Sequence, residues 1–170
     1  YTADLIRPYI EPIHKLYSME DINIFYNQVL QQILLPNSAF NKNKSGLNVI
    51  LIRVSDIATY KNNGDLQTNE DIKLKEFIEA INNFKNNMHV PLLLMITPSL
   101  HNNAEEEKYF DQIEGILQKQ LVDVKNLILL RAKDLLKDPK ANVFNLFTNK
   151  HGDIPYTLEF YHSLSFHILR

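Results

Sequence analysis

Apolar residues occur along this chain in two patterns, as short continuous runs and as stripes that recur every three or four positions. The most prominent run lies within residues 46–56, which Gly46 opens and the polar residues Arg53, Ser55 and Asp56 close. A continuous apolar run bounded by turn-forming residues predicts a strand buried on both faces. We therefore expect the fold to be organised around this strand.

The same two patterns predict the remaining elements. Further apolar runs predict strands at residues 22–26, 90–96 and 127–130. Stripes of helical period predict helices over residues 2–17, 29–34, 68–88, 102–121 and 155–169, with a polar loop at 41–45 and an irregular segment at 137–150. Helices that alternate with short apolar strands imply parallel crossovers. The expectation is one domain over residues 1–170, a three-layer α/β/α sandwich of flavodoxin-like type with a parallel sheet.

Composition narrows the function classes. The chain of 170 residues has a formal net charge of −2, which argues against nucleic-acid or anionic-membrane partners because both favour a basic surface. Cysteine is absent, and the six histidines show no metal-ligand spacing. Four glycines leave little scope for a phosphate-binding loop, so no cofactor is expected and a flavin-type binding domain is disfavoured. There is no G-x-S-x-G elbow, and no apolar run is long enough for a membrane span.

Polar residues next to the predicted strands are the candidate site. Ligands of open parallel sheets bind beyond the carboxyl ends of the strands. The candidate substrate-binding residues are Asn27, Gln28, Arg53, Ser55 and Asp56. Two pairs among these residues each have two open interpretations. Arg53 and Asp56 form either a strand-end ion pair or cap, or a ligand contact; Asn27 and Gln28 either cap a helix or donate to a ligand.

Four sequence blocks resemble the N-terminal SGNH-hydrolase-like domain of FkbH-like proteins, which also occurs within modular polyketide synthases and nonribosomal peptide synthetases. The blocks follow in order along the chain: Tyr1-Thr2-Ala3-Asp4, Phe25-Tyr26-Asn27-Gln28-Val29 with Gln31-Gln32-Ile33-Leu34, residues 46–56, and Gly152-Asp153-Ile154-Pro155-Tyr156-Thr157 with Glu159-Phe160. The resemblance implies a flavodoxin-like sheet, in agreement with the strand pattern. It also implies that the chain is excised from a larger cytoplasmic multidomain synthase. Because the sequence begins at Tyr1-Thr2 with no strand ahead of its first predicted helix, we expect either a trimmed chain or a first strand lost before residue 1.

The chain departs from that family where catalysis would occur. An SGNH esterase uses a serine after its first strand, an asparagine among its oxyanion donors, and a histidine before its last helix. The place of the serine offers only Thr2, and the place of the asparagine, near Ser55 and Asp56, holds no asparagine. Asp153 stands at the histidine position, which leaves His151 two residues earlier. The resemblance therefore implies an incomplete triad.

Two function classes follow from these departures. The first is a degenerate, non-catalytic domain that positions carrier-bound acyl intermediates, with an acyl carrier protein or neighbouring synthase domains as partners. The alternative is an active acyltransferase or esterase in which Thr2 is the nucleophile and His151, assisted by Asp153, is the base. Each of these residues also has a structural interpretation: Thr2 as a helix N-cap, His151 as a solvated loop residue, and Asp153 as a cap of the last helix.

Overall fold

The computed structural model describes Ile6, Pro8 and residues 26–60, 72–136, 142–152 and 155–169, with the side chains of 26, 27, 151 and 152 left out. The chain divides into two compact units: unit 1 comprises Tyr1–Ile24 and Lys133–Arg170, and unit 2 comprises Phe25–Ala132. The predicted helix at 2–17 and strand at 22–26 lie outside the described residues, except that Ile6, Pro8 and Tyr26 are helical. The single domain over 1–170 stays a prediction.

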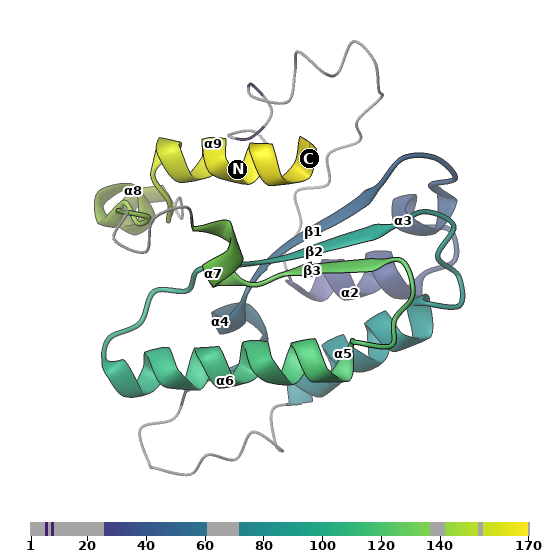
Figure 1. The fold of residues 1–170 in the computed structure, drawn as a ribbon, viewed down its shortest axis with the longest axis horizontal. Helices are drawn as coiled ribbons and strands as arrows, with labels where there is room; N and C mark the ends of the chain where they lie inside the picture. The colour runs from purple at the N-terminus through teal and green to yellow at the C-terminus, as the bar shows by residue number, and fades with distance from the viewer. Residues whose placement is uncertain are drawn as a thin grey trace. The chain divides into compact units, whose positions relative to one another are not determined.

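Unit 2 contains a three-stranded parallel sheet in the order β1-β2-β3 (Figure 1). The strands are β1 (Asn48–Arg53), β2 (Leu92–Thr97) and β3 (Leu127–Leu130). Asn48 pairs with Leu92 and Arg53 with Thr97, while Leu92 also pairs with Leu127. Both pairings are parallel, so all three carboxyl ends lie at the same edge of the sheet. An α/β fold with a parallel sheet is therefore confirmed.

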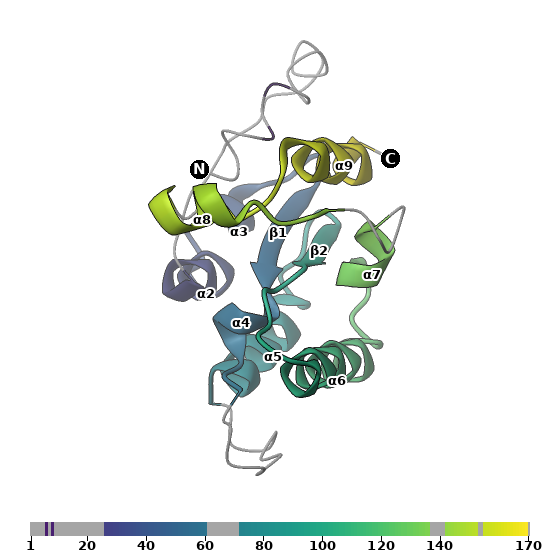
Figure 2. The ribbon, with the colours of Figure 1, turned by 90° about the vertical axis from the view of Figure 1, so that its left-hand side faces the viewer.

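The helices of unit 2 pack a core against one face of this sheet. They are α2 (Tyr26–Leu34), α3 (Ala39–Lys42), α4 (Val54–Ile57), α5 (Ile72–Phe84) and α6 (Ala104–Gln120). Figures 1 and 2 show α5 and α6 next to each other along the same face. Alternate strand residues meet the helices in one buried cluster that includes Ile50, Ile52, Leu92, Leu94, Ile96, Phe77, Ile81, Ile113 and Leu117. Burial of such side chains supplies most of the driving force for folding.

The two longest strands differ in burial, and this difference corrects one prediction. In β1, buried residues alternate with half-buried ones, whereas all six residues of β2 are buried. β2 lies between two neighbouring strands, and β1 has one neighbour among the described strands. The prediction that the strand within residues 46–56 is buried on both faces is therefore wrong. The central, fully buried strand is β2, which follows the proline at position 91.

Local signals explain where α6 and β3 begin. The side chain of Asn103 accepts a hydrogen bond of 2.8 Å from the backbone N–H of Glu106 and so forms the N-cap of α6. The acidic residues of the first turn suit the positive end of the helix dipole. Just before β3, Asn126 adopts a φ of 62°, and asparagine tolerates this left-handed conformation better than most residues. β3 itself spans the four residues that the sequence predicts.

Two short helices occupy segments predicted to be loops. α3 begins after Ser38, whose hydroxyl caps it by accepting from the N–H of Asn41, so the loop prediction at 41–45 is wrong over its first two residues. α8 (Leu146–Gly152) falls largely within the segment predicted to be irregular. Asn145 caps α8 by accepting a bond of 3.2 Å from the N–H of Thr148. In both helices a serine or asparagine side chain caps the first turn, a role that the sequence analysis did not assign to Ser38 or Asn145.

The longer helices described in unit 1 are α8 and α9 (Leu158–Leu169). The short helix α7 (Ala132–Leu135) begins at the last residue of unit 2 and continues into unit 1. An isolated antiparallel bridge joins Phe144 to Tyr156. The ring of Tyr156 packs against Phe144, Phe160 and Tyr161 at centroid distances of 4.8 to 5.7 Å. This aromatic cluster fixes the start of α9, close to the predicted closing helix.

Candidate functional site

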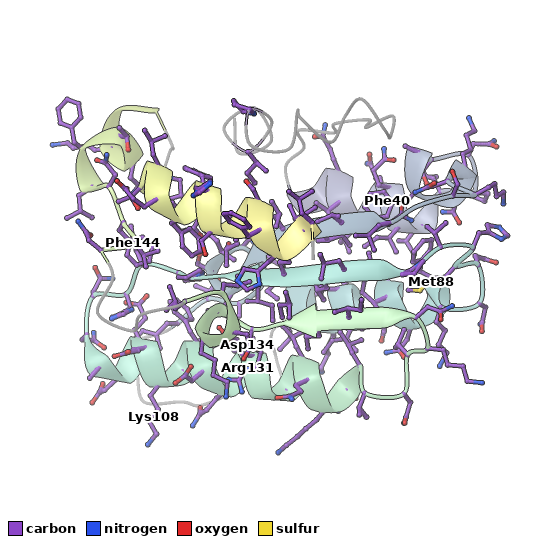
Figure 3. The ribbon with its side chains drawn as sticks, turned by 45° about the horizontal axis from the view of Figure 1, so that its top comes forward. Phe40, Met88, Lys108, Arg131, Asp134 and Phe144 are labelled. Carbon is purple, nitrogen blue, oxygen red and sulfur yellow. The ribbon has the colours of Figure 1, made fainter. Side chains whose placement is uncertain are left out.

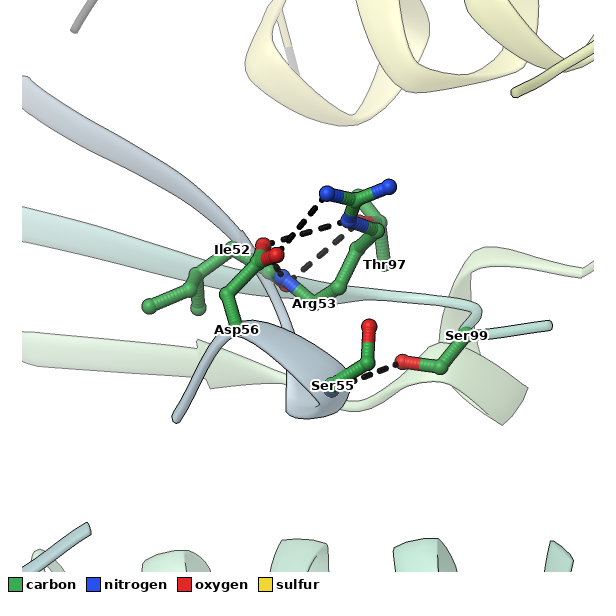
Figure 4. Close-up of polar contacts among 6 residues, drawn as sticks. All are labelled: Ile52, Arg53, Ser55, Asp56, Thr97 and Ser99. Atoms are coloured by element: carbon green, nitrogen blue, oxygen red, sulfur yellow. Dashed lines mark hydrogen bonds and ion pairs between the residues drawn. The ribbon is translucent and has the colours of Figure 1, made fainter. Parts of the chain in front are cut away.

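Arg53 and Asp56 form a two-point ion pair at the carboxyl end of β1 (Figure 4). The Nη2 of Arg53 donates to Oδ1 of Asp56 at 2.8 Å, and its Nε donates to Oδ2 at 3.1 Å. The backbone N–H of Arg53 also donates to Oδ2 at 3.1 Å, so the carboxylate caps the first turn of α4. Parallel N–H···O bonds of this kind fix the plane of the guanidinium. The strand-end ion pair and the cap are therefore both present, and a ligand contact stays a prediction.

The hydroxyls at the neighbouring strand end bond to the backbone. Ser99, which follows β2, accepts a hydrogen bond of 3.2 Å from the N–H of Ser55 (Figure 4). The hydroxyl of Thr97 is buried and donates to the carbonyl oxygen of Ile52 at 3.3 Å. These bonds tie the end of β2 to β1 and the start of α4. The contact from Ser55 comes from its backbone, and the role of its side chain in substrate binding stays a prediction.

A phenol joins the loop after α4 to the start of α6. The hydroxyl of Tyr60 donates to Oε2 of Glu105 at 3.0 Å, and the Tyr60 ring packs on Tyr109. Partial burial raises the pKa of the Tyr60 hydroxyl, and the bond to the Glu105 carboxylate raises it further. The phenol is therefore a proton donor at neutral pH. No sequence motif singled out Tyr60, because its partner lies 45 positions away.

The remaining predicted residues are only partly covered by the structure. Asn27 and Gln28 lie in the first turn of α2, which packs against α5, and the side chain of Gln28 is exposed. His151 lies in α8, a helix where the prediction had a loop. Thr2 and Asp153 lie outside the described residues. The structure therefore brings together Arg53, Ser55 and Asp56 and leaves the proposed catalytic residues untested.

A second carboxylate–arginine pair lies at the carboxyl end of β3, and the sequence analysis did not identify it. Glu114 on α6 accepts a hydrogen bond of 3.0 Å from Nε of Arg131, the residue after β3 (Figure 3 labels Arg131). Both side chains are largely buried, with 5% of Glu114 and 15% of Arg131 exposed. The carboxylate of Asp111, one turn earlier on α6, lies 4.0 Å from Nη2 of Arg131 and is 73% exposed.

Burial raises the pKa of the Glu114 carboxyl, because the apolar surroundings disfavour its charged form. The hydrogen bond and the charge of Arg131 oppose this effect, as does a backbone hydrogen bond from Ala132. The balance favours the raised pKa. A buried carboxyl with a raised pKa marks either a functional site or a structural ion pair. Here its recorded partners are an arginine and a backbone N–H, which fits a structural pair.

The two arginines point to opposite faces of the sheet. Ile52 belongs to the core that the helices cover, and Leu129 packs against that core. Side chains alternate along a strand, so Arg53 lies on the face opposite Ile52, while Arg131 lies on the face of Leu129, where α6 packs. The polar strand ends at Arg53 and Arg131 therefore do not face the same side of the sheet. An open depression on α6, lined by Gln112, Gly115, Ile116 and Lys119, contains none of the candidate residues.

The described part of the chain contains neither a metal-binding cluster nor a membrane-spanning helix. No three histidine, aspartate or glutamate side chains among these residues are grouped to hold a metal ion. Every helix within the same ranges is too short or too polar to span a lipid bilayer. In comparisons with known proteins, no family model, no curated protein and no solved structure matches the chain.

Proposed function

We propose that this chain is a degenerate SGNH-hydrolase-like domain of a polyketide or nonribosomal peptide assembly line, which positions carrier-bound acyl intermediates without catalysing their transfer. Its residue blocks and their order along the chain support this assignment. The finer form of the fold, a three-layer flavodoxin-like sandwich, belongs to the same proposal. The parallel pairing of the three described strands supports it, because parallel sheets are usually covered by helices on both faces.

The observation that carries the proposal is the state of the polar groups after β1 and β2. Ser99 accepts from a backbone N–H, Thr97 donates to a carbonyl, and the Asp56 carboxylate bonds to Arg53. A hydroxyl becomes a nucleophile when a positioned base takes its proton. The recorded bonds of these residues instead build a rigid strand end. Such an arrangement favours presenting a fixed polar surface over activating a hydroxyl.

Arg53 is the central contact of the proposed surface. Its side chain is 41% exposed, so part of the guanidinium reaches solvent while Asp56 fixes its plane. A preoriented guanidinium binds the phosphate of a carrier-attached arm, or a thioester carbonyl, at a low cost in side-chain entropy. The ion pair is thus compatible with the ligand-contact interpretation of Arg53.

Carrier titration tests the proposal. The isotopically labelled chain is titrated with acyl carrier proteins from its own gene cluster, and amide shifts are followed by NMR. We expect shift changes around residues 53–56 and 97–99, weakened in Arg53→Gln and retained in the matched control Lys119→Gln on the outer face of α6. The absence of a shift change with every cognate carrier would remove the proposal.

An activity assay separates the proposal from the enzyme alternative. The chain is incubated with p-nitrophenyl esters and acyl-thioesters, and we expect no turnover. Turnover abolished by Thr2→Ala and by His151→Ala would establish the acyltransferase or esterase instead. Turnover that survives both substitutions would contradict that triad as well as the non-catalytic proposal.

A further inference from the structure

One buried carboxylate forms hydrogen bonds with the residues at which unit 2 ends. Unit 2 ends at Ala132, directly after Arg131. The Glu114 carboxylate receives both the Nε–H of Arg131 and the backbone N–H of Ala132. Glu114 lies on α6, 17 positions before Arg131. One side chain therefore bonds to the last two residues of the unit.

The end of β3 is a place where local opening is expected. β3 has four residues and pairs with β2 alone among the described strands. The side chain of Ile128 is 50% exposed. Short edge strands with exposed side chains are among the parts of a protein that open most readily. The hydrogen bonds that Arg131 and Ala132, the two residues after β3, donate to Glu114 on α6 oppose that opening.

We infer that Glu114 is an anchor that keeps the carboxyl end of β3 closed where the chain passes out of unit 2. The anchor is a local device, distinct from the carrier-binding surface proposed above, which lies on the other face of the sheet. A buried ion pair gains little net folding free energy, because removing both charges from water costs about as much as their attraction returns. Its consequence is a defined position for Arg131 and Ala132.

Hydrogen exchange tests the anchor in the whole chain. Glu114→Gln keeps the size of the side chain but removes one charged acceptor. We expect the amide of Ala132 to exchange about tenfold faster, as for the loss of one hydrogen bond, while the amide of Leu94 in the centre of β2 is unchanged. The matched control is Asp111→Asn, which alters the exposed carboxylate 4.0 Å from the same guanidinium and leaves Ala132 exchange as in the parent chain.

Two outcomes overturn the inference. Unchanged exchange at Ala132 in Glu114→Gln means that the carboxylate holds nothing there. Equal acceleration at Ala132 and Leu94 means that Glu114 supports the whole unit and not its exit. Glu114→Asp is the second variant, since it keeps the charge and withdraws it by one methylene, and it is expected to give the same local acceleration. Neither readout depends on a carrier protein, so failure here leaves the proposed function standing.

Discussion

Two arginine–carboxylate pairs occur at strand ends of the same sheet, and they differ in every property that decides their energetics. Arg53 and Asp56 are three positions apart, and 41% and 29% of their side chains are exposed. Arg131 and Glu114 are 17 positions apart and are nearly buried. The first pair is a local cap in contact with solvent. The second joins a helix to the end of a strand inside the protein.

The difference teaches that two pairs of the same residue types need not have similar energies. An ion pair at the surface is screened by water and contributes about 0 to 1 kcal/mol. A buried pair is costly to form but more costly to break, because the remaining charge is left without a partner. The pair at β1 should therefore tolerate substitution that the pair at β3 does not.

The largest expected effect follows removal of the buried guanidinium. Arg131→Met leaves the Glu114 carboxyl buried beside an apolar side chain, and we expect the free energy of unfolding to fall by about 3 kcal/mol. Arg53→Met is the matched variant at the exposed pair, with an expected loss of about 1 kcal/mol or less. Urea unfolding followed by circular dichroism measures both. Equal losses would contradict the comparison between the two pairs.

A smaller effect is expected in the pH dependence of stability. Since burial raises the pKa of Glu114 in the folded chain, the folded state holds a proton that the unfolded state has already lost. The stabilisation from that proton is present at low pH and disappears as pH rises through the raised pKa. The stability of the parent chain relative to Glu114→Gln should fall over this interval and then level off. If this stability difference rises with pH instead, folding lowers the pKa of Glu114 and does not raise it.

The smallest effect is expected at Asp56. Asp56→Asn keeps an oxygen that accepts from the N–H of Arg53 but loses the charge, so we expect a loss of about 0.5 kcal/mol. In about 1 M salt the loss should shrink, because exposed charges are screened. Urea unfolding at two salt concentrations checks both statements. A loss as large as that of Arg131→Met would show that the exposed pair has been misjudged.

The local pair of Arg53 and Asp56 could be predicted from the sequence, whereas the buried pair of Arg131 and Glu114 could not. Arg53 and Asp56 follow an apolar run at helix-turn spacing, so an ion pair or cap was one of two interpretations. Glu114 sits in the stripe of α6 between Ile113 and Leu117, where a lone glutamate looks like a solvent-facing residue. Its burial depends on Arg131, and no periodicity within α6 encodes that contact. Long-range polar contacts of this kind need the tertiary structure.

The strands show the same division between local and tertiary information. The positions of β2 and β3 follow from their apolar runs, and the N-cap of α6 follows from Asn103. Which strand is central does not follow, because the runs in β1 and β2 look alike although β1 alternates and β2 is wholly buried. Strand order is a property of the assembled sheet. The runs predicted the α/β class but did not show which of the described strands is central.

The parallel pairing of the sheet has a consequence for biosynthesis. Asn48 pairs with Leu92, and Leu92 pairs with Leu127, so none of the described strands pairs with one joined to it by a tight hairpin. During translation β1 must therefore wait, with its apolar side chains unpaired, until the segment containing β2 has emerged from the ribosome. Parallel sheets assemble slowly for this reason and are prone to aggregation in the meantime.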